Sequence, residues 1–239
     1  MEIMKLFEAK RKKLWNGEIP TIAFLGDSIT QGCFEFYMRN DKEFSTVFDS
    51  ENSYPTIFGK MLKTLFPSVP VNIINAGISG DSAVGGAMRV ERDILSRKPH
   101  LTVVSFGLND TFEREEGLEK YKKSLEKIFS LLKADGGEVI FMTQNMMNTY
   151  VSCHIKEPHL IKIAEDTMRR QNDGTVDLYF DSAREVAEKY GVPVCDAYEK
   201  WKRMDAAGVD TTALLANHIN HPNREMHTLF ASMLLDVII

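Results

Sequence analysis

The sequence predicts an α/β fold: a three-layer α/β/α sandwich with a central, mainly five-stranded parallel sheet. Two observations carry this prediction. Short apolar runs alternate along the chain with longer segments of helical periodicity, and 44% of the 239 residues are hydrophobic, enough for a sizeable core in one domain spanning 1–239. Strands that alternate with helices form βαβ units, which place helices on both faces of a parallel sheet.

The five apolar runs are predicted to be buried strands, because near-continuous runs of this length are typical of parallel sheets. They span residues 20–25, 69–74, 101–106, 138–143 and 192–195. In such sheets, ligands bind where loops leave the carboxyl ends of the strands. The loops after residues 25, 75, 106, 143 and 195 are therefore the places to search for a site.

Amphipathic stripes predict the helices between these strands. Residues 54–65 and 118–132 carry apolar side chains at spacings of three and four, and 82–97 and 175–190 have less regular stripes. The last helix is expected to start at Pro222. Its predicted buried residues are Met226, Leu229, Phe230, Met233, Leu234 and Val237.

Composition limits the functional classes. The formal net charge of −5 gives no indication of a nucleic-acid partner. The basic run Lys10-Arg11-Lys12-Lys13 is interpreted as the solvated face of an N-terminal helix within residues 1–18, rather than as a targeting or polyanion patch. No apolar stretch is long enough to span a bilayer, and no secretory signal is visible. We therefore expect a soluble, cytoplasmic protein.

The three cysteines are scattered along the chain. Cys33, Cys153 and Cys195 form neither a disulfide framework nor a pair with metal-ligand spacing. His154 and His159 lie five residues apart without an acidic companion, which is poor evidence for a metal site. The pattern thus favours a reduced protein without a metal.

Polar loops follow the first two predicted strands. Gly26-Asp27-Ser28-Ile29-Thr30 follows the first, where a glycine allows a sharp turn and Ser28 begins the next segment. Asp27 or Ser28 could equally be a helix cap. The second strand leads to a loop in which Gly80 precedes a helix; a glycine there lets a substrate oxygen approach its backbone N–H, or is simply an ordinary turn glycine.

Two further polar residues stand at comparable positions. Asn109 follows the third strand and can direct an amide N–H into a site, or can simply be a turn residue. His221 precedes Pro222 at the expected entrance of the last helix, where it can serve as a general base or remain a surface residue. Each of these signals is weak by itself.

Their order along the chain resembles the SGNH hydrolases, also called GDSL esterases and lipases, from about residue 21 to the end. The resemblance implies a flavodoxin-like sandwich and a carboxylic ester hydrolase that needs no metal or organic cofactor. It matches Ser28 to the nucleophile and His221 to its base. It also implies an oxyanion hole made of the N–H groups of Ser28 and Gly80 and the side-chain amide of Asn109.

One position departs from the family pattern. The family has Asp-x-x-His, whereas this chain has His218 three residues before His221. A backbone carbonyl or a neighbouring amide could orient the base instead, or an acid could come from elsewhere. The side chains considered for such support are Asp27, Asn217, His218, Asn220 and Asp210. Without a carboxylate partner, we expect the pKa of His221 to lie at or below about 6.5.

The substrate class is predicted only in outline. We expect a small-molecule ester, with O-acetyl groups on carbohydrate as one class; an acyltransferase or a non-catalytic carbohydrate-binding relative are the alternatives. Residues 31–53 and 144–172 leave the predicted active-site edge. The first segment is rich in phenylalanine and tyrosine, and the second carries Met146, Met147, Tyr150 and two histidines. They are interpreted as covers for the acyl or alcohol group, or else as packing on the body or contacts in a homo-oligomer.

Overall fold

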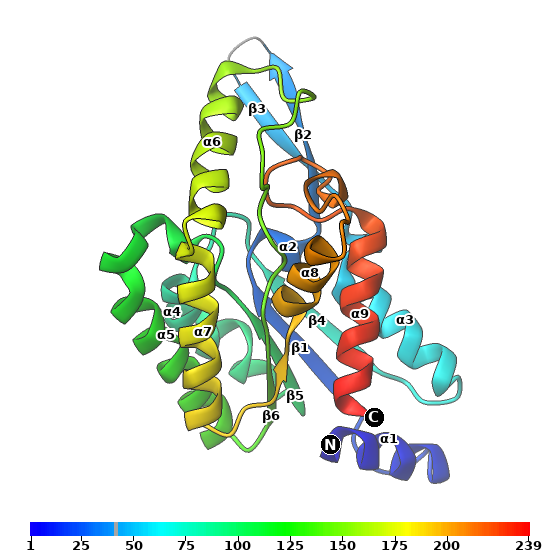
Figure 1. Cartoon of the computed structure of the whole chain (residues 1–239). Helices are drawn as coiled ribbons and strands as arrows, with labels where there is room; N and C mark the ends of the chain where they lie inside the picture. Colours follow the sequence, from blue (N-terminus) through cyan, green and yellow to red (C-terminus); the bar gives the residue numbers. More distant parts are fainter. Residues whose placement is uncertain (41–42) are drawn as a thin grey trace.

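A parallel five-stranded sheet in the order β4-β1-β5-β6-β7 forms the centre of the molecule (Figure 1). The structure, a computed structural model, describes residues 1–40 and 43–239. Within them the sheet strands are β1 (Thr21–Gly26), β4 (Asn72–Gly77), β5 (Leu101–Ser105), β6 (Glu138–Met142) and β7 (Val194–Cys195). All four pairings between them are parallel, so the predicted α/β architecture is confirmed.

Alternation along the buried strands divides the core into two halves. Ile22 and Phe24 of β1 face one cluster, while Ala23 and Leu25 face the other. The first half packs under α1 (Glu2–Lys12), α3 (Tyr54–Leu65), α8 (Ala197–Ala206) and α9 (Arg224–Ile238). The second half packs under α4 (Ala83–Asp93), α5 (Arg114–Ala134) and α7 (Thr175–Lys189), which gives the predicted three layers.

Strand β4 differs from its prediction in both position and burial. It begins at Asn72, three residues later than the predicted 69–74 run, because its pairing with β1 aligns Asn72 with Thr21. Val69 is buried, but it lies in the turn before the strand, and Pro70 has no N–H to pair. β4 is an edge strand without a single fully buried residue, so the prediction of burial on both faces is wrong here.

A β-hairpin and a helix extend beyond the carboxyl end of the sheet. The hairpin of β2 (Cys33–Asn40) and β3 (Glu43–Phe48) lies beside α6 (Pro158–Asn172) there (Figure 1). Phe36 of the hairpin packs with Leu160 of α6 in a small separate apolar cluster. These elements fall in the predicted edge segments 31–53 and 144–172; residues 41–42 of the first lie outside the described residues.

Short helical turns complete the chain between these elements. They are α2 (Ser28–Gln31), η1 (Ser50–Asn52), η2 (Leu95–Arg97), η3 (Asp110–Glu113) and η4 (Thr212–Leu214). Among the residues described, no helix has the length and apolar character needed to cross a membrane.

The basic run at the end of α1 is only partly the solvated face that was predicted. Arg11, Lys12 and Lys13 are exposed, but Lys10 is buried. Its ammonium donates to the carbonyl oxygens of Asn16 (3.2 Å) and Gly17 (2.9 Å) and so holds the turn that follows the helix. Lys10 is therefore buried because its ammonium binds the turn that follows α1.

Helix α9 begins at Arg224 rather than at Pro222. Pro222 pairs instead with Leu215 in an isolated bridge, and Asn223 is the N-cap, whose side chain accepts from the N–H of Met226 at 3.0 Å. Phe230 and Leu234 are buried as predicted. Met226, Leu229, Met233 and Val237 are only half-buried, because the helix presents His227, Ala231 and Ile238 to the core as well.

Replacement of the Asn223 cap tests this boundary. Asn223→Ala should lower the free energy of unfolding by about 1 kcal/mol, since the first turn of α9 loses its side-chain acceptor. Asn223→Asp keeps an acceptor oxygen and should remain close to wild type. Urea unfolding followed by circular dichroism measures both; equal stability of the alanine and aspartate variants would contradict this assignment.

Candidate active site

Ser28 and His221 are 193 positions apart in the sequence and meet at the carboxyl end of β1. The Ser28 Oγ lies 3.0 Å from Nε2 of His221, and both residues are buried. The other ring nitrogen, Nδ1, lies 3.0 Å from the carbonyl oxygen of Phe34. Because a carbonyl oxygen can only accept, Nδ1 carries the proton, and Nε2 is left to accept the hydroxyl hydrogen of Ser28.

The imidazole has a backbone carbonyl where a carboxylate was considered. Burial lowers the pKa of His221 to about 4, and the hydrogen bond to Phe34 opposes this shift only in part. Asp210, the acid considered from the sequence, accepts from the Tyr150 hydroxyl and the N–H of Ala213 instead. The base is therefore neutral over most of the pH range.

The other side chains considered as supports for His221 hold the loop that carries it rather than its imidazole ring. Asn217 Oδ1 accepts from the backbone N–H groups of Ile219, Asn220 and His221, each at 2.9–3.0 Å. Asn220 in turn accepts from Asn217 Nδ2 through its side chain. His218, at the position of the family aspartate, has a left-handed backbone with φ of 57° and stacks on His154. The hydrogen bonds to the Asn217 side chain thus fix the backbone that carries His221.

Ser28 is placed by the tight turn between β1 and α2. Asp27 is the N-cap of α2, and its Oδ1 accepts from the N–H of Ile29 at 3.0 Å, so the cap of this helix is Asp27 and not Ser28. A Cβ at Gly26 would come within 2.9 Å of the carbonyl oxygen of Ser105 on β5. Because glycine has no Cβ, the turn can pass close to β5, and Ser28 takes the first position of α2.

The three predicted oxyanion donors come from three different strand ends. No acceptor within residues 1–40 and 43–239 pairs with the backbone N–H of Ser28 or Gly80. Gly80 has a φ of 78°, which favours glycine. Asn109 Nδ2 donates to the carbonyl oxygen of Asp81 at 2.8 Å and, over a longer distance of 3.3 Å, to Oδ2 of Asp27.

Gln144 is a site residue that the sequence reasoning did not select. Its Nε2 donates to Asp27 Oδ2 at 2.8 Å, and its Oε1 accepts from the N–H of Leu108 at 2.8 Å. Burial raises the pKa of Asp27 to about 6, and the hydrogen bonds from Gln144 and Ile29 oppose that rise. Gln144 directly follows the predicted strand 138–143, so its place after a strand end was the available signal.

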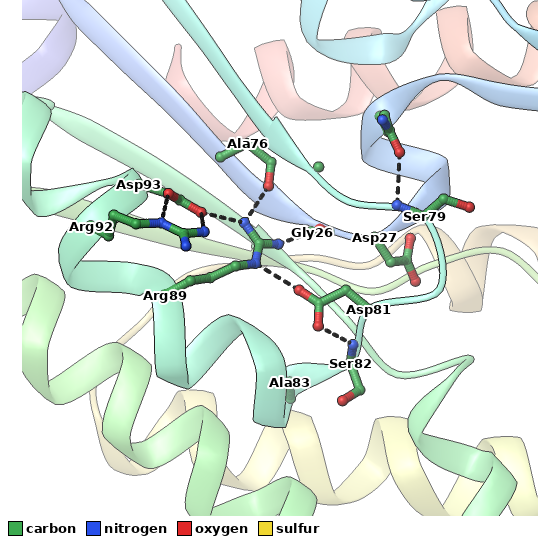
Figure 2. Close-up of polar contacts among 12 residues, drawn as sticks. Gly26, Asp27, Ala76, Ser79, Asp81, Ser82, Ala83, Arg89, Arg92 and Asp93 are labelled. Carbon is green, nitrogen blue, oxygen red and sulfur yellow. Dashed lines mark hydrogen bonds and ion pairs between the residues drawn. The ribbon is translucent and has the colours of Figure 1, made fainter.

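Arg89 is the second residue that was missed. Figure 2 shows its guanidinium between the strand ends and the loop that carries Gly80. It donates to the carbonyl oxygens of Gly26 (2.8 Å) and Ala76 (2.6 Å), and it forms an ion pair with Asp81 (2.7 Å). An arginine that interrupts the apolar stripe of residues 82–97 was the only sequence signal for this role.

Comparison with known proteins shows which family this chain belongs to. A model of the GDSL-like lipase/acylhydrolase family matches residues 24–229, so the chain belongs to that family and is a carboxylic ester hydrolase. The resemblance inferred from the four loops is thereby confirmed.

Individual relatives agree with this family. An acetylxylan esterase of Geobacillus stearothermophilus is 25% identical over 186 residues, which cover 74% of each chain. A crystal structure of an acetyl xylan esterase matches with a TM-score of 0.67 and 21% identity, covering 92% of this chain and 100% of that one. A two-domain esterase active on acetylated mannans also gives 0.67 and 21%, over 98% of this chain and 51% of its own. At these identities, the two structures show a shared fold.

The buried position of Arg89 predicts a large effect on stability. Arg89→Met should lower the free energy of unfolding by about 3–5 kcal/mol, because Asp81 would lose its partner and two carbonyl oxygens would lose their donor. Arg92 lies on the same helix, but its side chain is 73% exposed and, among the described residues, pairs only with Asp93. Arg92→Met should therefore change the unfolding free energy by less than about 1 kcal/mol. Equal losses in the two variants would contradict the role given to Arg89.

Proposed function

We propose that this chain hydrolyses carboxylic esters through an acyl-enzyme formed on Ser28, with His221 as the general base. The observation that carries the proposal is the 3.0 Å contact between Ser28 Oγ and His221 Nε2, with Nδ1 held by the Phe34 carbonyl. A serine hydroxyl is a weak nucleophile until an adjacent base takes its proton. The tautomer imposed by Phe34 presents the lone pair that this step needs.

In the first half of the reaction, Ser28 Oγ bonds to the ester carbonyl carbon while its proton passes to Nε2 of His221. The carbonyl oxygen becomes an oxyanion. When the tetrahedral species collapses, the bond to the alkoxy oxygen breaks, and that oxygen takes the proton from His221 and leaves as the alcohol. Water then attacks the acyl carbon with His221 again as base, and release of the acid restores the Ser28 hydroxyl.

The oxyanion is stabilised by the free N–H groups of Ser28 and Gly80 and by Asn109 Nδ2. Asn109 donates in the free site to the Asp81 carbonyl and to Asp27. Its 3.3 Å contact with Asp27 is long for an N–H···O bond, so this is the contact that an oxyanion would replace. Its bond to Asp81 remains and keeps the amide oriented.

Acetyl groups on carbohydrate are the ester class we propose. The support is that the relatives described above include esterases named for acetylxylan and acetylated mannans. A buried nucleophile and base also suit a small acyl group, since Ser28 and His221 are each only 4% exposed.

Removal of the Ser28 hydroxyl should abolish turnover. Ser28→Ala is expected to lower kcat for p-nitrophenyl acetate by about three orders of magnitude or more, because no other group replaces the nucleophile. Ser68→Ala, at an exposed serine outside the site, is the matched control and should keep wild-type activity. Initial rates at pH 7 measure both, and a Ser28→Ala enzyme with wild-type kcat would exclude the acyl-enzyme on Ser28.

The pH dependence should reflect the low pKa of His221. Its lowered pKa keeps the imidazole neutral, and therefore active as a base, until the pH falls toward about 4. We expect the titration of His221 to make kcat/KM for p-nitrophenyl acetate fall with a midpoint between about 4 and 5. A midpoint at 6.5 or above would contradict a base held only by a carbonyl.

Two controls separate this midpoint from other titrations. Circular dichroism over the same pH range shows whether the fold persists. The pKa of Asp27 is about 6, so a second inflection there would come from its carboxyl. Asp27→Asn should remove that inflection and leave the one near 4 in place.

A further inference from the structure

A small cavity lies directly beside two of the proposed oxyanion donors. It has a volume of about 240 Å³ and lies between the start of α4, η3 and the first turns of α5. Gly80 and Asn109 form part of its wall. Pockets for drug-sized ligands typically measure about 300–1,000 Å³, so this one fits a single ring rather than a long chain.

Charged side chains make part of the wall polar. Glu113 and Lys120 form an ion pair across 3.1 Å at the cavity, and each is more than half exposed. An alkyl chain in this space would take water from these charges without replacing its hydrogen bonds, which is unfavourable. A ligand with several hydroxyl groups would offer donors to Glu113 and acceptors to Lys120 instead.

One aromatic ring in the wall is open to solvent. Phe112, which lines the cavity, is 74% exposed. The guanidinium of Arg170 lies 5.2 Å from its ring centroid, and Arg170 is itself buried and bonded to Thr111 and Asp166. The ring is therefore held in place from one side while the rest of its surface stays available. The electron-rich face of such a ring attracts the weakly positive C–H groups of a saturated ring.

Asp110 also lines the cavity, and one of its two carboxyl oxygens is buried without a partner among the described residues. It is 8% exposed, and its Oδ1 accepts from the N–H of Ala83 at 3.0 Å. Its Oδ2 has no hydrogen-bond partner in the described part of the chain. Burial raises the pKa of Asp110 to about 8, so that near neutral pH the carboxyl is mostly protonated and can donate.

We propose that this cavity is the subsite for one sugar ring of the ester substrate, with Phe112 as its stacking surface and Glu113 and Lys120 as its hydroxyl partners. The proposal rests on the proposed function, because it assumes that the ester cleaved at Ser28 is carried on carbohydrate. The hairpin aromatics fit this role less well. Phe36 and Phe44 pack against each other, and against His221 and His159 respectively, at 5.3–5.4 Å.

The test compares two esters that share an acetyl group but differ in the alcohol. One is p-nitrophenyl acetate, which has no sugar, and the other is acetylated xylobiose. Phe112→Ala and Lys120→Met should each raise KM for acetylated xylobiose by about tenfold with little change in kcat, because they remove binding that is not specific to the transition state. Activity on p-nitrophenyl acetate should stay within about twofold of wild type.

Trp15→Ala is the matched control. Trp15 is 99% exposed and follows α1, which lies at the far end of the sheet from the hairpin (Figure 1). This variant should leave both substrates unaffected. Thermal melting of all variants confirms that the fold is kept, and Lys120→Met serves alone if Phe112→Ala does not fold.

Three outcomes would overturn the subsite. Equal losses on both esters would show a structural role, and unchanged KM for acetylated xylobiose would place the sugar elsewhere. A wild-type enzyme that cleaves p-nitrophenyl acetate but no acetylated sugar would exclude the subsite and leave ester hydrolysis intact. A wild-type enzyme that cleaves neither would instead refute the proposed function itself.

Discussion

The imidazole of His221 is held at both nitrogens, by the Ser28 hydroxyl on one side and the Phe34 carbonyl on the other. This buried contact links the hairpin, the nucleophile turn and the loop before α9. A carbonyl fixes the tautomer as a carboxylate would, but it stabilises the charged ring less, and burial adds to the difference. A pKa near 4 disfavours the imidazolium by about 3 kcal/mol relative to water. In the proposed mechanism, the neighbouring oxyanion offsets part of this cost when both charges form together.

A buried polar network keeps the remaining donors in register with this pair. Asp27 joins the cap of α2 to Asn109 and Gln144, which come from the ends of β5 and β6. Arg89 joins the ends of β1 and β4 to the loop of Gly80 through Asp81. The backbone at the sheet edge is thus tied together before any substrate arrives, and preorganised donors are effective for that reason.

The loops that carry two of the proposed oxyanion donors also line the small cavity. Gly80 and Asn109 belong to the proposed oxyanion hole and also to the small cavity behind it, so a group bound there would lie next to the reacting carbonyl. Phe112 and Glu113 come from η3 and Lys120 from α5, and the catalytic steps use none of these three side chains. Specificity can therefore vary on this side without disturbing Ser28 or His221.

The sequence by itself determined the α/β class, the five strand regions and the loops that hold Ser28, Gly80, Asn109 and His221. Local periodicity and the glycine and asparagine at strand ends are encoded within a few residues, so they can be read without a structure. The displaced β4 and the β2–β3 hairpin could not be read this way, since strand register depends on a distant partner.

Only the tertiary structure decided what supports His221. Every amino acid has a carbonyl oxygen, so no residue type marks Phe34 as the acceptor, and it lies 187 positions from the histidine. Gln144 and Arg89 were hidden for a similar reason: their partners are backbone groups and side chains from other strand ends. The reacting groups could be predicted from the sequence because their chemistry depends on side-chain type. The groups that hold them in place could not, because those contacts form only when distant parts of the chain fold together.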